Sequence, residues 1–502
     1  MIDKMKGKNK KLRRSKSFRM VSVFVSIFVS VSSFFLLQAE ELTLEHALAI
    51  AEKSSPSMKN AALRLEISEK NLWAEQAGLK SQFYMSITPI SVSSQRLFDD
   101  FTSSYYTQEI VKSEALFAIS QPIKWTDGTL TIIDRFNWQE ASSSFTGSVK
   151  EANFSNSLYF TLSQPLFTYN RTTMRIRELE LGLEDSQLNY VIRRLEIEKQ
   201  VTQQLLSLYY SRMSIQISQE EYKNATESYN IIKSKVRAGI SAPEELYQAE
   251  LTRANSLASL ENRRMQHENA LDNFKILLGL PLEEVIDVSA DIQKKIVEVD
   301  LSWAIDHGLN NRMEIRQKEI EIRYALDDLV RAGAENEFKA SVDLSFGLTG
   351  VDERFANIYD SPNKDRLIAV SLNIPVFDWG RRKHRLAASR AQVDTVKLSA
   401  SEEQKSIKYQ IREAYRNLLN QEKQIDIAEK NVKYAQLTYE INLERYKTGD
   451  LSSFDLQFYL LQLSQEKLNR VGALINYRLA LLDLKIRALW NFENNTSLVE
   501  NL

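Results

Sequence analysis

An internal repeat constrains the fold of this 502-residue chain more than any other feature of its sequence. Residues Gln164–Arg171 (QPLFTYNR) match Ile374–Arg381 (IPVFDWGR) at an offset of 210 residues. The same offset carries Val236–Gly239 onto Tyr446–Gly449. The chain is therefore one structural unit written twice rather than a series of unrelated domains.

Between these matches, an apolar residue recurs every seven positions in both copies. A sustained period of seven predicts long helices that supercoil against their neighbours, about 100 Å long at about 1.5 Å per residue. The core positions between successive members of each row are small or polar, which suits helices packed side by side in a wide cylinder. A plain antiparallel helical hairpin is the alternative. The two rows are Ile411, Leu418, Ile425, Val432, Tyr439 and Tyr446, and Val201, Leu208, Ile215, Tyr222, Tyr229 and Val236.

The amino-acid composition favours long helices and argues against several kinds of catalytic and metal-binding site. With 14 Gly and 8 Pro, the chain has too few turn formers for a loop-rich enzyme or a large all-β protein. It has no Cys, and its 4 His are scattered. A net charge of −1 gives no reason to expect a nucleic-acid partner. We therefore expect no cofactor, no metal site and no catalytic residue.

The first residues have the pattern of a secretory signal peptide. A Lys- and Arg-rich start is followed by the apolar run Val21–Leu37 and by Ala39. We expect residues 1–39 to be removed on export; an uncleaved anchor is the alternative. A lipoprotein is excluded, because there is no Cys to carry the lipid.

Each half also contains short segments in which apolar and polar residues alternate, the pattern of β-strands. Strands of about 9–11 residues cross a bilayer when tilted, although a half-buried soluble sheet has the same pattern. Pro165 and Pro375 are expected to end the ladder at the strand–helix junctions. Four main strands cannot close a barrel, so membrane spanning would need several copies, and three copies would give twelve strands. The segments are Phe83–Thr88, Leu158–Ser163, Ala340–Leu348 and Ile368–Val376.

The first half carries an insertion. Leu44 and Ala47 correspond to Leu301 and Ala304 at an offset of 257, which later falls to 210. The first half therefore holds 47 extra residues, which lie between Val92 and Phe154. Their partial alternation predicts an additional β-hairpin with an outward loop.

The long helices should turn at Gly239 and Gly449. Pro243 early in the next helix, and Ser452-x-x-Asp455 resembling a capping box, mark the restarts. The expected layout has five segments: a signal peptide (1–39), a first repeat (40–284), an inter-repeat equatorial segment (285–300), a second repeat (301–490) and a tail (491–502). In the first repeat we expect helices in 43–80 and 171–279 and strands in 82–168. In the second repeat we expect helices in 301–335 and 380–490 and strands in 338–377.

The order of these motifs resembles the TolC family of outer-membrane efflux proteins. The resemblance extends from the opening Leu42–Leu48 to Trp490, and includes the Pro-x-Phe junctions and Tyr446-x-x-Gly449. It implies a mainly α protein with β-strands, in which a homotrimer forms a 12-stranded barrel in outer-membrane lipid of a diderm bacterium, continued by a periplasmic α-barrel. It also implies a duct of a tripartite efflux or type I secretion system, with a periplasmic adaptor (membrane fusion) protein and an inner-membrane RND, ABC or MFS transporter as partners.

The resemblance also suggests site residues. The family's first entrance Asp corresponds to Asp455, whereas its second falls on Phe458 and its tip Arg on Leu451, so the latch departs from the family pattern. Helix-start acids that merely complement the helix dipole are the alternative reading of these positions. The implied sites are a periplasmic entrance (Asp455, Asp450, Glu244, Glu245, Tyr446), adaptor-docking tips (Gly239, Gly449, Leu451) and strand–helix junctions (Pro165, Pro375, Arg171, Arg381).

Two other classes compete with a channel. A secreted coiled-coil structural or adhesin-like protein would use the same helices without a pore. An enzyme is disfavoured, because the acids follow heptad faces and no nucleophile–base pair is present. The basic run Arg381–Arg385 is expected to contact the inner leaflet or to form a solvated face.

Overall fold

The structure, a computed structural model, describes residues 41–144, 149–288 and 294–499. All of them belong to one unit, Glu41–Leu502. The expected signal peptide lies outside these residues, as do residues 289–293 of the inter-repeat segment and the last three residues of the tail.

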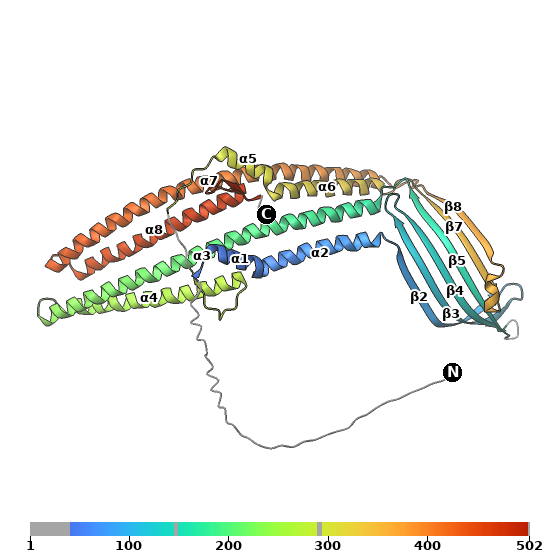
Figure 1. Cartoon of the computed structure of the whole chain (residues 1–502), viewed down its shortest axis with the longest axis horizontal. Helices are drawn as coiled ribbons and strands as arrows, with labels where there is room; N and C mark the ends of the chain where they lie inside the picture. The colour runs from blue at the N-terminus through green and yellow to red at the C-terminus, as the bar shows by residue number, and fades with distance from the viewer. Residues whose placement is uncertain (1–40, 145–148, 289–293, 500–502) are drawn as a thin grey trace, which may run out of the picture. The chain divides into compact units, whose positions relative to one another are not determined.

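Long helices in this unit lie side by side and lead into a sheet at one end (Figure 1). The same order occurs twice: two consecutive helices lead into strands, and the strands lead into a very long helix followed by a shorter one. The helices of the first copy are α1 (Leu44–Ser54), α2 (Pro56–Gly78), α3 (Arg171–Arg237) and α4 (Pro243–Leu278), and those of the second are α5 (Leu301–Asn311), α6 (Met313–Ala334), α7 (Arg381–Thr448) and α8 (Ser453–Ala488).

The heptad row explains why α7 continues for 68 residues. Ile411, Leu418 and Ile425 of this row are at most 2% exposed. The small residues Ala414 and Ala428, each three positions after a member of the row, are also buried, so α8 packs close against α7. A helix of this length depends on its packed face for stability, since propensity alone contributes little.

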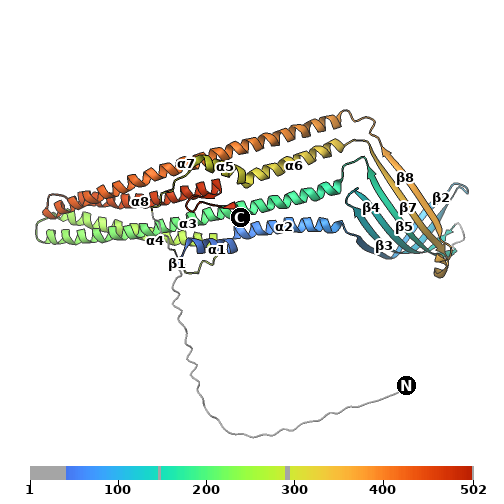
Figure 2. The ribbon, with the colours of Figure 1, turned by 45° about the horizontal axis from the view of Figure 1, so that its top comes forward.

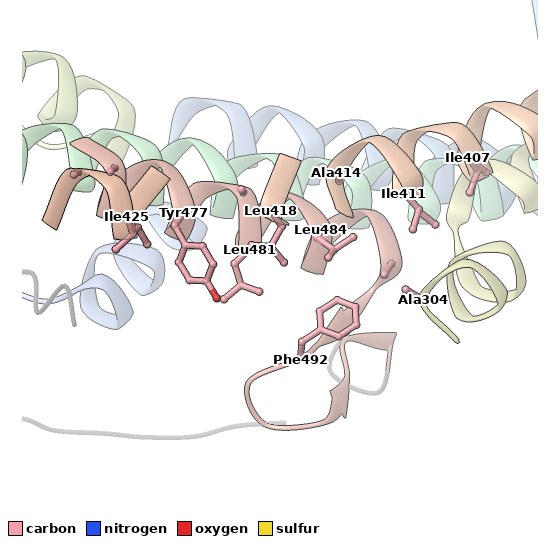
Figure 3. Packing of buried hydrophobic residues seen from close by; sticks show 14 residues of the cluster. Ala304, Ile407, Ile411, Ala414, Leu418, Ile425, Tyr477, Leu481, Leu484 and Phe492 are labelled. Carbon is pink, nitrogen blue, oxygen red and sulfur yellow. The ribbon is translucent and has the colours of Figure 1, made fainter. Parts of the chain in front are cut away.

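Two hydrophobic clusters, one in each copy, contain equivalent residues. Leu208 of the first cluster and Leu418 of the second stand 210 positions apart, and both are at most 2% exposed. Ala47 and its counterpart Ala304 are fully buried in the same two clusters. Figure 3 shows the second cluster, where α7, α8 and α5 meet. The two halves therefore repeat their packing as well as their sequence.

The strands form one antiparallel sheet in the order β2-β3-β4-β5-β7-β8. Two-stranded sheets, β1 with β6 and β9 with β10, lie elsewhere in the unit. The sheet strands are β2 (Gln82–Asp99), β3 (Ser104–Ile123), β4 (Gly128–Ser143), β5 (Lys150–Leu166), β7 (Lys339–Asp352) and β8 (Asn363–Asn373), and the short strands are β1 (Glu41–Leu42), β6 (Asp287–Val288), β9 (Trp490–Asn491) and β10 (Thr496–Ser497).

The expectation of four main strands was wrong, because the described sheet has six. The predicted hairpin in the insertion is confirmed: it is β3 and β4, paired from Gln108–Ser143 to Ile123–Gly128. The hairpin is not an appendage, however. It stands between β2 and β5, and its strands β3 and β4, with 20 and 16 residues, are similar in length to those neighbours, which have 18 and 17.

Charged residues make the alternation of these two strands only partial in the sequence. Lys112, Glu114 and Arg135 interrupt the apolar alternation of the insertion. In the sheet they pair with one another, Lys112 Nζ to Glu114 Oε2 at 2.6 Å and Arg135 Nε to Glu114 Oε1 at 3.6 Å. The first pair lies within β3 and the second joins β3 to β4, and such pairs make charged residues compatible with a strand.

Candidate channel entrance and membrane-facing sheet

The turns that join α3 to α4 and α7 to α8 lie at the end of the helices away from the sheet (Figures 1 and 2). Gly239 and Gly449 occupy them with φ of +73° and +92°. The amide of Gly239 donates to Val236 O at 3.0 Å, and that of Gly449 donates to Tyr446 O at 3.2 Å. These bonds are equivalent at the repeat offset. Nothing lies within 4 Å of a Cβ built at either glycine, so backbone conformation alone requires glycine there.

The two helices that leave these turns begin differently. Ser452 caps α8: the Asp455 amide donates to Ser452 Oγ at 3.2 Å, and Ser452 Oγ donates to Asp455 Oδ2 at 2.7 Å. Ser452 is therefore the N-cap of α8, as the motif predicts, but Asp455 accepts from the Ser452 hydroxyl and not from its backbone amide as in a full capping box. In α4, Ala242 provides no side-chain cap, and Pro243 is the first helical residue.

The four acids predicted for the entrance all lie at these tips and are exposed. Glu244 and Glu245 are in the first turn of α4, and Asp455 is in the first turn of α8. Asp450 follows Gly449 and accepts a hydrogen bond from Thr448 Oγ1 at 2.8 Å. Within the described ranges none of the four forms an ion pair, and the last turns of α3 and α7 place Lys235, Arg237, Arg445 and Lys447 at the same tips. Leu451, at the family's Arg position, is half-buried.

Tyr446 differs from these acids because it is 5% exposed. Its ring lies against α3, with Lys235 Nζ 4.9 Å from the ring centroid. Burial raises the pKa of the phenol, and an interaction with the Ser228 hydroxyl opposes the rise. No described residue meets hydrogen-bond geometry with Tyr446 Oη. The structure therefore places Tyr446 between the two helical hairpins, as a contact of the second repeat with the first.

A cavity of about 330 Å³ lies between the hairpins next to Tyr446. Sequence reasoning missed it, because its walls come from both repeats and no local pattern marks it. Its polar and aromatic lining includes Glu221, Glu227, Tyr439, Phe454 and Gln457.

The strand–helix junctions hold the four predicted residues. Pro165 lies in the last part of β5, opposite Ser341, and Pro375 follows the end of β8. Arg171 is the first residue of α3, and Arg381 is the first of α7. Pro165 thus stands inside the ladder rather than after it.

The basic run at the start of α7 has protein partners that the sequence did not indicate. Glu335, directly after α6, pairs with Arg385 and with Arg381, whose Nη2 is 3.0 Å from Glu335 Oε1. Arg382 Nη2 pairs with Glu337 Oε1 at 2.9 Å. These arginines hold α7 to the end of α6 and remain largely exposed, which agrees with the expected solvated face and adds the glutamates as partners that the sequence did not indicate.

The two faces of the sheet differ in chemistry. On one face, Phe160 of β5 pairs with Phe346 of β7. On the other face, Ser163 Oγ donates to Asp343 Oδ1 at 2.7 Å, and Tyr159 Oη donates to Asp365 Oδ2 at 3.2 Å. One face is thus apolar, and the other is a hydrogen-bonded polar surface.

The edge strands carry exposed apolar rows on the first of these faces. β2 and β8 each have one strand neighbour in the described sheet, and their outer edges are unpaired. Every residue of the two rows is at least 58% exposed. The rows are Phe83, Met85, Ile87, Ile90 and Val92 on β2, and Ile368, Val370, Leu372, Ile374 and Val376 on and just after β8.

None of the described helices is long and apolar enough to cross a membrane.

The arrangement of helices and sheet is the fold of TolC-like outer-membrane channels. The CmeC outer membrane channel of Campylobacter jejuni superposes with a TM-score of 0.65, at 16% identity over 89% of this chain and 85% of that one. A membrane protein of Pseudomonas aeruginosa gives 0.67 at 14% identity over 89% and 90%, and the open MtrE channel of Neisseria gonorrhoeae gives 0.62 at 16% over 89% and 88%.

Residues 133–280 and 304–486 match the outer membrane efflux protein family, and the chain belongs to that family. The resemblance found in the sequence is thereby confirmed. Its members are transport ducts rather than enzymes. Nodulation protein T of Rhizobium leguminosarum is similar in two biovars: viciae at 22% identity over 41% of this chain and 42% of that protein, and trifolii at 24% over 49% and 53%. The matches thus span about half of these relatives.

Proposed function

We propose that the chain is the outer-membrane duct of a tripartite efflux or type I secretion system, and that it has no reaction of its own. The observation that carries the proposal is the exposed apolar face of a sheet whose two outer edges are unpaired, joined to long helical hairpins with acidic tips. In a soluble rod or adhesin, this face of the sheet would expose a contiguous apolar surface to water, which is unfavourable.

The apolar rows of β2 and β8 fit the thickness of a membrane. Each row spans about nine residues, which rise about 30 Å along a strand and less when the strand tilts. Basic residues follow each row at the end away from the helices: Arg96 on β2, and Arg366 and Lys364 on β8. Apolar side chains in the hydrocarbon and cations near the headgroups are the expected distribution for membrane-spanning strands.

The unpaired edges require further copies of the chain. Backbone groups of β2 and β8 cannot stay unpaired in lipid, and a six-stranded sheet is too small to close on itself. In a homotrimer, β8 of each copy would pair with β2 of the next, giving eighteen strands. The twelve-stranded barrel expected from four strands per copy is therefore replaced by an eighteen-stranded one in this proposal.

The tips form the periplasmic entrance in this proposal. Three copies of Glu244, Glu245, Asp450 and Asp455 would surround the axis with negative charge, which attracts cations. The adaptor would dock around Gly239, Gly449 and Leu451, and an RND, ABC or MFS pump would supply the energy. Residues 1–39 would direct export, and the segment 285–300 would join the repeats 40–284 and 301–490 at the equator.

Planar-bilayer recording with the purified full chain tests the proposal. We expect discrete channels that divalent cations block from one side. Asp455→Asn should weaken the block, because it removes one charge per copy yet keeps the oxygen that accepts from Ser452. Glu261→Gln, a matched change on α4 away from the tip, should leave the block unchanged. Absence of conductance would favour the pore-free adhesin, and equal block in both variants would remove Asp455 from the entrance.

A further inference from the structure

The cavity between the helical hairpins has the size of a small-molecule site. It lies near the tips seen at one end of Figure 2, and its volume of about 330 Å³ corresponds to a compound of about two rings. Its walls come from four helices: Glu221 on α3, Ala249 on α4, Tyr439 on α7 and Leu456 on α8. A molecule bound there would touch both repeats at once.

The apolar and aromatic part of the lining defines the body of a ligand. Ala249, Tyr446 and Leu456 are at most 7% exposed and form its buried floor. Aromatic rings of Tyr439 and Phe454 and aliphatic side chains complete the wall. The remaining aliphatic lining residues are Ala225, Ile231, Leu443, Leu460 and Leu461.

The charges of the lining are unbalanced. Glu221 is half-buried, and no ion pair or hydrogen bond is described for its side chain; burial raises the pKa of its carboxyl, and the more distant Arg263 opposes the rise. Glu227 is a second carboxylate. The single cation of the lining, Lys447, is engaged with Glu444 at 2.8 Å. A carboxylate beside an apolar wall, without a cation in contact, is complementary to a positively charged ligand.

A second and independent observation points into the same cavity. Tyr446, which is 5% exposed, lines the cavity, and no described residue meets hydrogen-bond geometry with its hydroxyl, although the Ser228 hydroxyl of the same lining is near enough to influence it. A buried hydroxyl without a partner costs free energy, which a ligand donating or accepting a hydrogen bond would recover.

We propose that this cavity binds an amphipathic organic cation of the arylamidine or arylammonium class. Its aromatic body would lie between the hairpins, and its N–H groups would donate to the Glu221 carboxylate or to Tyr446 Oη. Because the ligand contacts α3, α4, α7 and α8 together, its binding stabilises the arrangement in which the two hairpins are closed upon each other.

Three probes of one shape test the proposal on the full-length protein in detergent: biphenyl-4-carboxamidine, the neutral biphenyl-4-carboxamide and the anionic biphenyl-4-carboxylate. Isothermal titration should give the amidine an affinity about tenfold above that of the amide, and the carboxylate should bind weakest. Binding is measured without any membrane current, so its outcome is independent of the proposed channel activity.

Two variants identify the groups responsible. Glu221→Gln should abolish the preference for the amidine and leave amide binding unchanged, whereas Glu261→Gln on the same hairpin should change neither. Tyr446→Phe should weaken binding of the amidine and of the amide with little change in the thermal midpoint, because the nearby Ser228 hydroxyl lies outside hydrogen-bond geometry with the hydroxyl that is removed. Equal binding of the three probes, or an amidine preference that survives Glu221→Gln, would overturn the proposal.

Discussion

Gly449 and Gly239 show how a single residue sets the position of a tip. Both have φ in the left-handed region, where a Cβ is strained, although open space surrounds them. The same two hydrogen bonds recur at each turn: Ile240 N donates to Lys235 O at 2.9 Å, and Asp450 N donates to Arg445 O at 2.9 Å. The turn is therefore fixed by backbone geometry rather than by packing.

Gly449→Ala should destabilise the protein by about 1–2 kcal/mol, because alanine disfavours left-handed φ. Gly78→Ala is the matched control: Gly78 ends α2, its Cβ would also meet nothing within 4 Å, and its φ is not positive. That change should be neutral or stabilising by about 0.4–1 kcal/mol. Thermal unfolding of both variants checks this, and an equal loss in the two would show that open space, not φ, decides the outcome.

The glutamates after α6 illustrate what single residues do at the junction of helix and sheet. Glu335 accepts a hydrogen bond from Arg385 and forms an ion pair with Arg381, and these interactions hold the pKa of its carboxyl below the usual range. Stability from this group is therefore present above the ordinary Glu pKa and is lost as the pH falls through the lowered value. The pairs are exposed, so each contributes little alone, and their value lies in fixing where α7 begins.

Among the elements, β8 shows most clearly how the faces of the sheet are used. Val370 stands on the apolar face opposite Val342 and is 62% exposed. Its neighbour Ala369 pairs with Asp343 on the polar face. One step along the strand thus moves a side chain from the proposed lipid surface to the proposed water-filled interior.

Val370→Arg should reduce assembly in the outer membrane, since an arginine near the middle of the bilayer costs about 2–4 kcal/mol. Ala369→Arg places the same charge on the polar face and should be tolerated. The amount of protein recovered in the outer-membrane fraction measures the difference. If Ala369→Arg were the more harmful change, the assignment of the two faces would be reversed.

For the whole molecule, the hairpin of β3 and β4 determines the width of the proposed barrel. Removing it would leave β2 and β5 as neighbours; both already run in the directions that an antiparallel pair needs. Three copies would then supply twelve strands instead of eighteen.

Deletion of residues 102–147 should therefore lower single-channel conductance by about twofold or more, because barrel diameter grows roughly in proportion to strand number. Block by divalent cations at the tips should be unaffected, which serves as the control for correct folding. Unchanged conductance with retained block would mean that the hairpin does not contribute to the conducting barrel.

Much of the architecture was predictable from sequence because its determinants are local and periodic. The repeat offset placed Gly239 and Gly449 in equivalent turns, and the heptad row identified Leu418 and Ile425 as core residues. Both patterns reflect the geometry of a single helix, so no knowledge of its neighbours was needed.

The strands were predictable only in part. On β2, alternation stops at Pro89, but a β-bulge between Thr88 and Ser91 restores the apolar face, so that Ile87 pairs with Ala115 and Val92 with Val111. One extra residue shifts the alternation, so a sequence pattern assigns every later side chain to the wrong face of the strand. The cross-strand register shows that the apolar side chains stay on one face.

The duplicated helical plan, the turns at the tips and the acids beside them can be read from the amino-acid order alone, because each depends on contacts within a few residues. The six-stranded sheet, the arginine–glutamate pairs at the junction and the cavity beside Tyr446 become visible in the folded chain. Those features join residues that stand far apart in the chain, and their physical basis is the pairing of charges, hydrogen-bonding groups and apolar surfaces across elements, which no local pattern records.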